Sequence, residues 1–335
     1  MKLTKKYIIG THVMFYEVDM IQEFIQSVYS AIVLVDNPEN ITCDFEFNIS
    51  EVFEEVDTQQ CSKEELCFKF EQAISTLKTL GCKVTSTVYS DTAPKSMINY
   101  RRDLNYFGCQ EYDLIIWGES DCLIPAQTFI VLDQLATYAD EQAIYNYITT
   151  FAVRKMWDES WKVIEHADFE NLPYISIGTH PKEARETPYS IRYTMSIEEM
   201  NEINNKVDDL DIRILTQPKF DGSCLIISSN LIKAGANIPP GFFGLAAEDT
   251  AFMYSCMQVM KSDYKQFVIK NLLKVHNRVH PNKRKFVKGN TDIEYNPREG
   301  NQKYETLRKL NNENLSRIFN GERILSFKDW PYYEG

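Results

Sequence analysis

Short apolar runs alternate with amphipathic stretches along the first 125 residues of the chain. The runs are bounded by turn-forming residues, which predicts strands at residues 7–10, 31–35, 83–89 and 113–117, the first of them buried. Between the runs, apolar residues recur at helical spacing, which predicts helices at residues 20–29, 68–80 and 99–107. Strands that alternate with helices indicate an α/β fold with a mostly parallel sheet and right-handed crossovers.

Polar residues follow each of the predicted strands. In parallel α/β sheets, ligands bind beyond the carboxyl ends of the strands, so these residues are site candidates. They are Thr11, His12, Asp36, Asn37, Ser90, Asp91 and the segment 118–121. Carboxylates that meet in one cleft repel each other, and a divalent cation offsets that repulsion. Taken singly, each acid is equally typical of a helix N-cap or a turn.

The composition is that of a globular protein with a substantial core. The chain has 335 residues, of which 44% are hydrophobic and 25% charged, so one large or two moderate domains are expected. No apolar run approaches the ~20 residues of a membrane span, and the short run after Met1–Lys6 does not resemble a secretory signal. The eight cysteines form no Cys-x-x-Cys pair, which favours reduced thiols in a cytoplasmic protein.

The net charge of −12 is unevenly distributed. Residues 261–310 carry 13 Lys or Arg against 5 Asp or Glu, so this segment is at +8 and the remainder at −20. Residues 36–71 alone hold 11 acids and two lysines. The basic segment suits a polyanionic partner that the acidic part would orient, although a charge run is also typical of a solvated face.

Four segments form a more specific pattern. Two of them are apolar strands that end in an acidic turn, one holds a pair of arginines, and the last combines a glycine-rich loop with an acid pair. They are Val35–Asn37, Ser96–Asn105 with Arg101-Arg102, Asp113–Pro125 with Glu119-Ser120-Asp121, and Phe220–Phe252 with Glu248-Asp249. In this order, they resemble the GT-A nucleotide-sugar glycosyltransferases of the large inverting family-two type. The resemblance covers about residues 7–36 and 81–280.

The resemblance implies a GT-A fold, a Rossmann-like sheet flanked by helices, with insertions. It divides the chain into a nucleotide-sugar-binding half at residues 1–125, an acceptor-binding half at 126–290 and a C-terminal extension at 291–335. Relative to the family's minimal form, residues 41–80 and 157–215 look like insertions, and the second of them is a natural place for acceptor-specific structure.

The resemblance also implies a nucleotide-diphosphate sugar donor, a UDP-sugar above all, held with Mn²⁺ or Mg²⁺. Asp121 stands in the usual metal-ligand place, Glu119 replaces the first Asp of the family's Asp-x-Asp, and Cys122 stands where the family often adds an acid. His276 matches a late histidine ligand better than His280 does. The donor-binding candidates are Thr11, Asp36 at the nucleobase, Asp91, Arg101 and Arg102 beside the diphosphate, Glu119 and Ser120.

The acid pair near residue 250 matches the family's acceptor site. Asp249 corresponds to the general base that deprotonates the acceptor hydroxyl, and Glu248 would contact acceptor or donor. The implied reaction is a single displacement with inversion. The same pair is also typical of a helix N-terminus, where the helix dipole favours acids.

The acceptor is less well defined by the sequence. Lys283, Arg284, Lys285 and Lys288 follow His276 and would lie near the site's rim. They suggest a polyanionic acceptor, such as a hydroxymethylated base in phage DNA. The chain is also rich in Lys, Ile, Asn, Tyr and Phe, as AT-rich viral genomes tend to encode. A glycan or lipid-linked saccharide is the alternative acceptor. In that case, the four basic residues would lie on an anionic membrane surface. A degenerate GT-A binding module is a third reading, motivated by Glu119 and Cys122.

Overall fold

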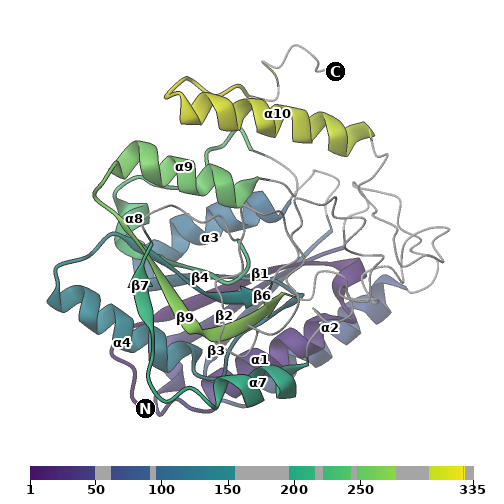
Figure 1. Cartoon of the computed structure of the whole chain (residues 1–335). Helices are drawn as coiled ribbons and strands as arrows, with labels where there is room; N and C mark the ends of the chain where they lie inside the picture. The colour runs from purple at the N-terminus through teal and green to yellow at the C-terminus, as the bar shows by residue number, and fades with distance from the viewer. Residues whose placement is uncertain are drawn as a thin grey trace, which may run out of the picture.

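The computed structural model describes residues 1–49, 62–90, 96–154, 196–215, 222–242, 247–276, 302–326 and 328. In these residues, nine strands form one sheet in the order β3-β2-β1-β4-β8-β6-β9-β5, with β7 also paired to β9 (Figure 1). The strands are β1 (Tyr7–Met14), β2 (Ile41–Asn48), β3 (Lys83–Tyr89), β4 (Leu114–Gly118), β5 (Cys122–Leu123), β6 (Tyr147–Arg154), β7 (Ile212–Ile214), β8 (Leu225–Ser228) and β9 (Lys265–His276).

Most of the sheet is parallel. Strands β1 to β4 run in one direction, and β6 and β9 share it because β8 lies antiparallel to both β4 and β6. The chain starts at β1, moves outward to β2 and β3, and then returns to β4 on the other side of β1. The carboxyl ends of β1 and β4 therefore flank a topological switch point, where α/β proteins bind ligands.

Helices cover both faces of the sheet. They are α1 (Ile21–Ile32), α2 (Lys63–Lys78), α3 (Met97–Glu111), α4 (Thr128–Glu141), α7 (Ile197–Asn204), α8 (Ser229–Lys233), α9 (Glu248–Met260) and α10 (Gln302–Phe319). One core packs α1, α2 and α4 against one face, and a second core packs α3, α8 and α9 against the other. The predicted α/β fold with a mostly parallel sheet flanked by helices is thus confirmed.

The local predictions for β1, β3, β4, α1, α2 and α3 are also confirmed, apart from their ends. In β1 all eight residues are buried, since the strand lies inside the sheet and is covered on both faces. In α1 the buried side chains of Ile21, Phe24, Ile25 and Val28 follow the helical spacing that the sequence shows. No described helix is long and apolar enough to cross a membrane.

The predicted strand at 31–35 is wrong. Ala31 and Ile32 complete the buried face of α1, because they continue its three- and four-residue spacing. The second strand of the sheet is β2, inside the region 41–80 that looked like an insertion. The acids Asp44 and Glu46 interrupt its apolar pattern, so the sequence did not indicate a strand here. In the structure Asp44 accepts a hydrogen bond from Tyr100 and Glu46 pairs with His12, so both acids have polar partners.

Of the second predicted insertion, only the end falls in the described residues. There α7 packs on β9, and β7 pairs with it. Residues 157–195 lie outside the described part of the chain.

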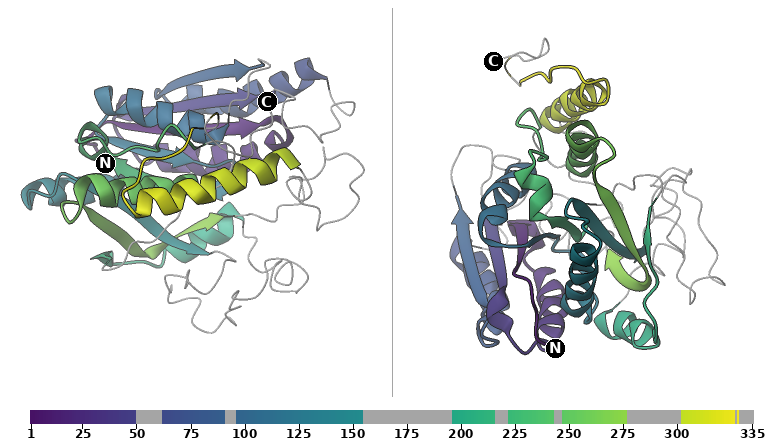
Figure 2. Two further views of the ribbon diagram at one scale, coloured as in Figure 1. Left: turned by 90° about the horizontal axis from the view of Figure 1, so that it is seen from above. Right: turned by 90° about the vertical axis from the view of Figure 1, so that its left-hand side faces the viewer.

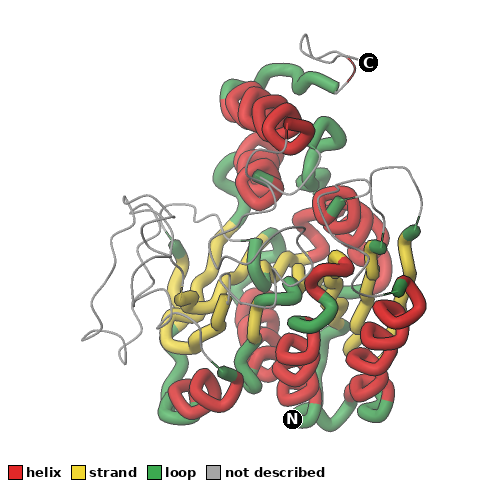
Figure 3. The backbone as a smooth tube through the Cα atoms, turned by 90° about the vertical axis from the view of Figure 1, so that its right-hand side faces the viewer, coloured by secondary structure: helices red, strands yellow, loops and turns green. Residues whose placement is uncertain are grey.

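The C-terminal helix α10 lies on α9, on the side away from the sheet (Figures 2 and 3). Asn314 of α10 is fully buried. Its Nδ2 donates to the carbonyl oxygens of Gly241, at 3.0 Å, and Leu325, at 2.9 Å, and its Oδ1 accepts from the Leu325 N–H at 2.8 Å. This one side chain therefore ties α10 to the loop that precedes α9.

Replacing that amide should lower the stability of the fold. In Asn314→Leu three backbone groups lose their partner, and we expect the free energy of unfolding to fall by about 2–3 kcal/mol. Denaturant unfolding measures the change. Asn312→Leu is the matched control, because Asn312 is exposed on the same helix and should change stability by less than about 0.5 kcal/mol. Equal effects in the two variants would contradict the anchoring role.

Candidate active site

Two carboxylates and one imidazole meet at the carboxyl end of β4. Strand β4 ends at Gly118, and Glu119 and Asp121 follow it. The next strand, β5, pairs antiparallel with β9 and sets Cys122 opposite His276. As a result His276 Nε2 lies 3.2 Å from Glu119 Oε2 and 3.4 Å from Asp121 Oδ2. The structure thus brings together the three residues that the sequence suggested as metal ligands.

The three side chains fit a divalent cation. Each offers one ligand atom, and these atoms all lie within 4.8 Å of one another. Carboxylate oxygens and an imidazole nitrogen suit Mn²⁺, and three ligands leave positions open for phosphate oxygens. Both carboxylates are largely buried, so their mutual repulsion is poorly screened and favours a bound cation.

Arg101 of α3 lies beside these carboxylates. Its side chain is 1% exposed, and its Nη2 donates to Glu119 Oε1 and its Nη1 to Glu248 Oε1, both at 2.7 Å. Nη2 also donates to the carbonyl oxygen of Gly222 at 3.2 Å. The guanidinium carbon lies 4.8 Å from the centre of the Trp117 ring, in a cation–π contact. The buried guanidinium of Arg101 therefore joins the carboxylates that follow β4 to the start of α9.

The acid pair begins α9. Glu248 is buried, whereas Asp249 is half-buried. Asp249 Oδ1 accepts from the N–H of Thr250 at 2.7 Å, and Oδ2 accepts from the N–H of Gly222 at 3.3 Å. A Cβ on Gly222 would lie 2.9 Å from Arg101 Nη1 and 3.2 Å from Glu248 Oε1, so this glycine is needed for the close approach.

The environment shifts the pKa values of two of these acids in opposite directions. Burial and the neighbouring charge of Asp249 raise the pKa of Glu248 to about 7, although Arg101 opposes the shift. Burial acts to raise the pKa of Glu119 as well. The neighbouring Arg101 and His276 together have a larger opposite effect, so the pKa of Glu119 lies below its ordinary value. A carboxyl group whose pKa is near 7, beside a carboxylate that stays ionised, is typical of catalytic sites.

The raised pKa of Glu248 predicts a pH dependence of stability. The folded chain holds this proton up to about pH 7, whereas the unfolded chain releases it near 4.5. The stabilisation is therefore complete below about 4.5 and is lost as the pH rises through about 7, on the order of 3 kcal/mol in total.

Glu248→Gln isolates this contribution, since glutamine keeps the shape and cannot titrate. Denaturant unfolding at pH 5, 6, 7 and 8 should show the original chain losing stability relative to the variant. If the two stability curves run parallel over this range, Glu248 is ionised throughout and the expectation is wrong.

The guanidinium of Arg102 donates to backbone carbonyl oxygens. Its Nε donates to the carbonyl oxygen of Ile238 at 2.9 Å, and its Nη2 donates to those of Pro239 and Phe242 at 2.8 and 3.0 Å. Arg102 thus fixes the loop that precedes α9. Arg101 likewise has its donors directed at carboxylates and a carbonyl. The phosphate contacts of the two arginines therefore stay predictions, and they would require these hydrogen bonds to rearrange.

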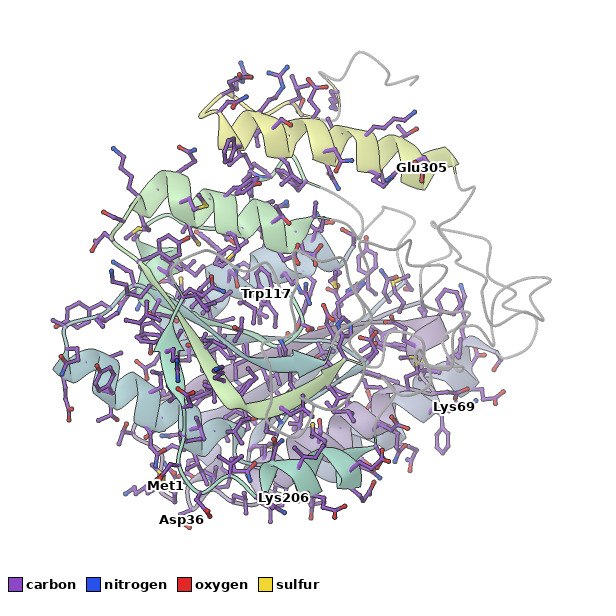
Figure 4. The ribbon with its side chains drawn as sticks, viewed as in Figure 1. Met1, Asp36, Lys69, Trp117, Lys206 and Glu305 are labelled. Atoms are coloured by element: carbon purple, nitrogen blue, oxygen red, sulfur yellow. The ribbon has the colours of Figure 1, made fainter. Side chains whose placement is uncertain are left out.

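Asp36 is also displaced from its predicted role. It lies before β2, at the amino end of the sheet, because the expected strand at 31–35 is part of α1. Its side chain is 72% exposed and 3.4 Å from the N-terminal ammonium of Met1. Figure 4 shows both residues at an edge of the molecule away from Trp117. Asp36 therefore cannot reach a nucleobase bound at the carboxyl ends of the strands.

The remaining predicted residues divide into two groups. Thr11 is buried inside β1, opposite Gly118 of β4, because β1 continues to Met14, and Ser120 is buried just after β4. Within the described residues the Thr11 hydroxyl has no hydrogen-bond partner. The others lie outside the described residues; they are Asp91, Lys283, Arg284, Lys285 and Lys288.

Two features of the site were missed from the sequence. Lys274 is fully buried in β9, two residues before His276, and its Nζ donates to the carbonyl oxygen of Ser223. His12, expected to be structural, pairs with Glu46 through Nδ1 at 2.9 Å, and both are buried. A lysine between the apolar residues Leu272, Leu273 and Val275 was the available signal for Lys274, because buried lysines need a specific partner.

Comparison with known proteins gives distant matches in structure alone. No protein-family model and no curated protein sequence matches the chain. Residues 1–349 of TarS from S. aureus match at 13% identity and a TM-score of 0.42, covering 80% of this chain and 59% of that one. The chain thus spans about three fifths of that protein's resolved length.

A second match is glucosyl-3-phosphoglycerate synthase from M. tuberculosis, at 12% identity and a TM-score of 0.38, covering 83% of this chain and 74% of that one. The same enzyme in complex with Mn²⁺, UDP and glucosyl-3-phosphoglycerate matches at 14% identity, with the same coverage and TM-score. At these identities and scores, the matches do not assign a function to the chain.

Proposed function

We propose that the chain is a metal-dependent glycosyltransferase of the GT-A type. It would move a sugar from a nucleotide-diphosphate sugar, a UDP-sugar above all, to an acceptor hydroxyl with inversion. One observation carries the proposal: a cation-binding cluster at the carboxyl end of β4 lies beside an acid pair at the start of α9, and Arg101 contacts both. Sugar transfer requires a stabilised nucleoside diphosphate as leaving group and a base that deprotonates the acceptor hydroxyl.

The first half of this chemistry belongs to the cluster of Glu119, Asp121 and His276. These residues would hold Mn²⁺ or Mg²⁺, with Mn²⁺ favoured by the imidazole. When bound, the cation neutralises the diphosphate and so makes the nucleotide a better leaving group. The cluster follows β4 at the switch point, where a diphosphate can approach from outside the sheet.

The second half belongs to the acid pair. Asp249 is the more accessible of the two, so it is the acid that an acceptor hydroxyl can reach, and we assign it the role of general base. Glu248 is buried against Arg101 and positions the pair. A base on one side of the sugar and a leaving group on the other give a single displacement with inversion.

Thermal unfolding in the presence of nucleotide sugars tests the proposal. A donor that binds with Mn²⁺ should raise the melting temperature by several degrees, because ligands that bind only the folded state stabilise it. The shift should require the metal and the diphosphate, so the parent nucleoside is the control. A shift without sugar turnover would favour the binding-module alternative, and no shift with any donor and metal would contradict the glycosyltransferase.

The acceptor is a separate part of the proposal. The +8 charge of residues 261–310 favours a polyanion, such as a hydroxymethylated base in phage DNA, over a neutral glycan or a lipid-linked saccharide. DNA binding whose affinity falls steeply between 50 and 200 mM salt is the expected result on that basis. Binding to anionic vesicles in place of DNA would instead favour the lipid-linked acceptor.

A further inference from the structure

We infer that Arg101 is a positioning residue that couples the cation cluster to the acid pair, so that cation binding and the state of Glu248 influence each other. The inference rests on the proposed function, since it takes Glu119 as a cation ligand. It adds to that function a link between donor binding and the acceptor half of the site.

The geometry of Glu119 is the first step. Its Oε1 accepts from Arg101 Nη2 at 2.7 Å, while its Oε2 lies 3.2 Å from His276 Nε2, on the side of the cation cluster. A cation and Arg101 would thus bind the two oxygens of one carboxylate. Because both draw on the same negative charge, a stronger contact with one partner weakens the contact with the other.

The second step is the other end of the guanidinium. Arg101 Nη1 donates to Glu248 Oε1 at 2.7 Å, and a guanidinium is planar, so its two ends move together. A change at Glu248 is therefore transmitted to Glu119 as a change in the position and charge balance of a single rigid group.

The surroundings leave this group little freedom to avoid the coupling. Arg101 lies against the Trp117 ring, and the indole N–H of that ring donates to Asn105 Oδ1 at 2.9 Å, which fixes its orientation. Gly222 also approaches so closely that a single added carbon would lie 2.9 Å from Nη1. Burial also keeps water from screening the charges.

Coupling between two sites is reciprocal and is measured as a change in affinity. At pH 8, where the Glu248 carboxyl group is mostly ionised, Glu248→Gln removes one of the two anionic partners of Arg101. Arg101 is then drawn more strongly to Glu119, where it competes with the cation. We expect the affinity for Mn²⁺ to fall about 5- to 10-fold, within the range of typical coupling between sites. Asp249→Asn removes the same charge from the next residue, whose carboxylate accepts from backbone N–H groups, and should change the affinity less than about twofold.

The test is calorimetric titration of the full chain with Mn²⁺ alone, without donor or acceptor. The variants are Glu248→Gln, Asp249→Asn, Arg101→Lys and the double variant Arg101→Lys with Glu248→Gln. Lysine keeps the buried charge but cannot donate to both carboxylates in the same way. In the Arg101→Lys background, we expect Glu248→Gln to lose most of its effect on Mn²⁺ affinity.

Equal weakening by Glu248→Gln and Asp249→Asn would show a general charge effect and overturn the inference while leaving the proposed function intact. This comparison decides the matter even if Arg101→Lys does not fold. An undiminished effect of Glu248→Gln in the lysine background would overturn it as well. A chain that binds Mn²⁺ and shows the coupling but transfers no sugar would overturn the proposed function alone, and a chain that binds no Mn²⁺ would overturn both.

Discussion

Asp121→Asn is expected to lower the affinity for Mn²⁺ by about 100-fold or more and sugar transfer by about 10³-fold. The Asp121 side chain is 5% exposed, and its Oδ2 faces His276 Nε2 at 3.4 Å. Asparagine keeps the shape but removes the charge that a divalent cation needs, in a cluster of only three ligands. Titration with Mn²⁺ and the rate of nucleoside diphosphate release measure the two effects.

Asp36→Asn is the matched control for this variant. The chemical change is the same, but Asp36 is exposed beside Met1 at the amino end of the sheet, so Mn²⁺ affinity and transfer should stay within about twofold of the original chain. If Asp121→Asn binds Mn²⁺ as the original chain does, the cluster after β4 is not the cation site. A large loss in Asp36→Asn would restore its predicted contact with the nucleobase.

The sequence was sufficient for the strands and helices whose patterns are local. Residues 83–89 are rich in β-branched side chains and residues 113–117 form a short apolar run, and the structure has strands there. It was not sufficient for β2, since Asp44 and Glu46 interrupt the expected pattern and their partners lie on β1, β3 and α3. Acids in a buried strand become intelligible only when those distant partners are known.

The same limit applies to the candidate site. The resemblance pointed to Glu119, Asp121 and His276, but their meeting depends on the pairing of β5 with β9, which joins residues about 150 positions apart in the chain. The contacts that the two arginines make in the structure could not be predicted for a related reason. A sequence shows that Arg101 and Arg102 are cationic, whereas their roles depend on partners from Glu119 to Glu248 and the loop at 238–242.

Asp249→Asn should abolish the proposed transfer through its effect on the chemical step. We expect kcat to fall about 10²- to 10⁴-fold, the usual contribution of a general base. Asparagine has one acceptor oxygen, so it can keep the 2.7 Å hydrogen bond from the Thr250 N–H and loses only the longer, 3.3 Å bond from the Gly222 N–H. The start of α9 should therefore keep its shape. Donor affinity, measured with Mn²⁺ present, should change less than about twofold, because Asp249 is not among the cation ligands.

The competing explanation is that Asp249 serves only the helix N-terminus, and Glu198→Gln provides its control. Glu198 is an exposed acid in the first turn of α7, so its loss removes a similar helix-dipole interaction, worth about 0.5 kcal/mol, from a helix outside the site. If Asp249→Asn loses stability to the same small extent and keeps its kcat, Asp249 is a helix-terminal acid and not the base. A loss of kcat in Glu248→Gln alone would move the role of base to Glu248, with a rate that rises through pH 7 as the carboxyl group ionises.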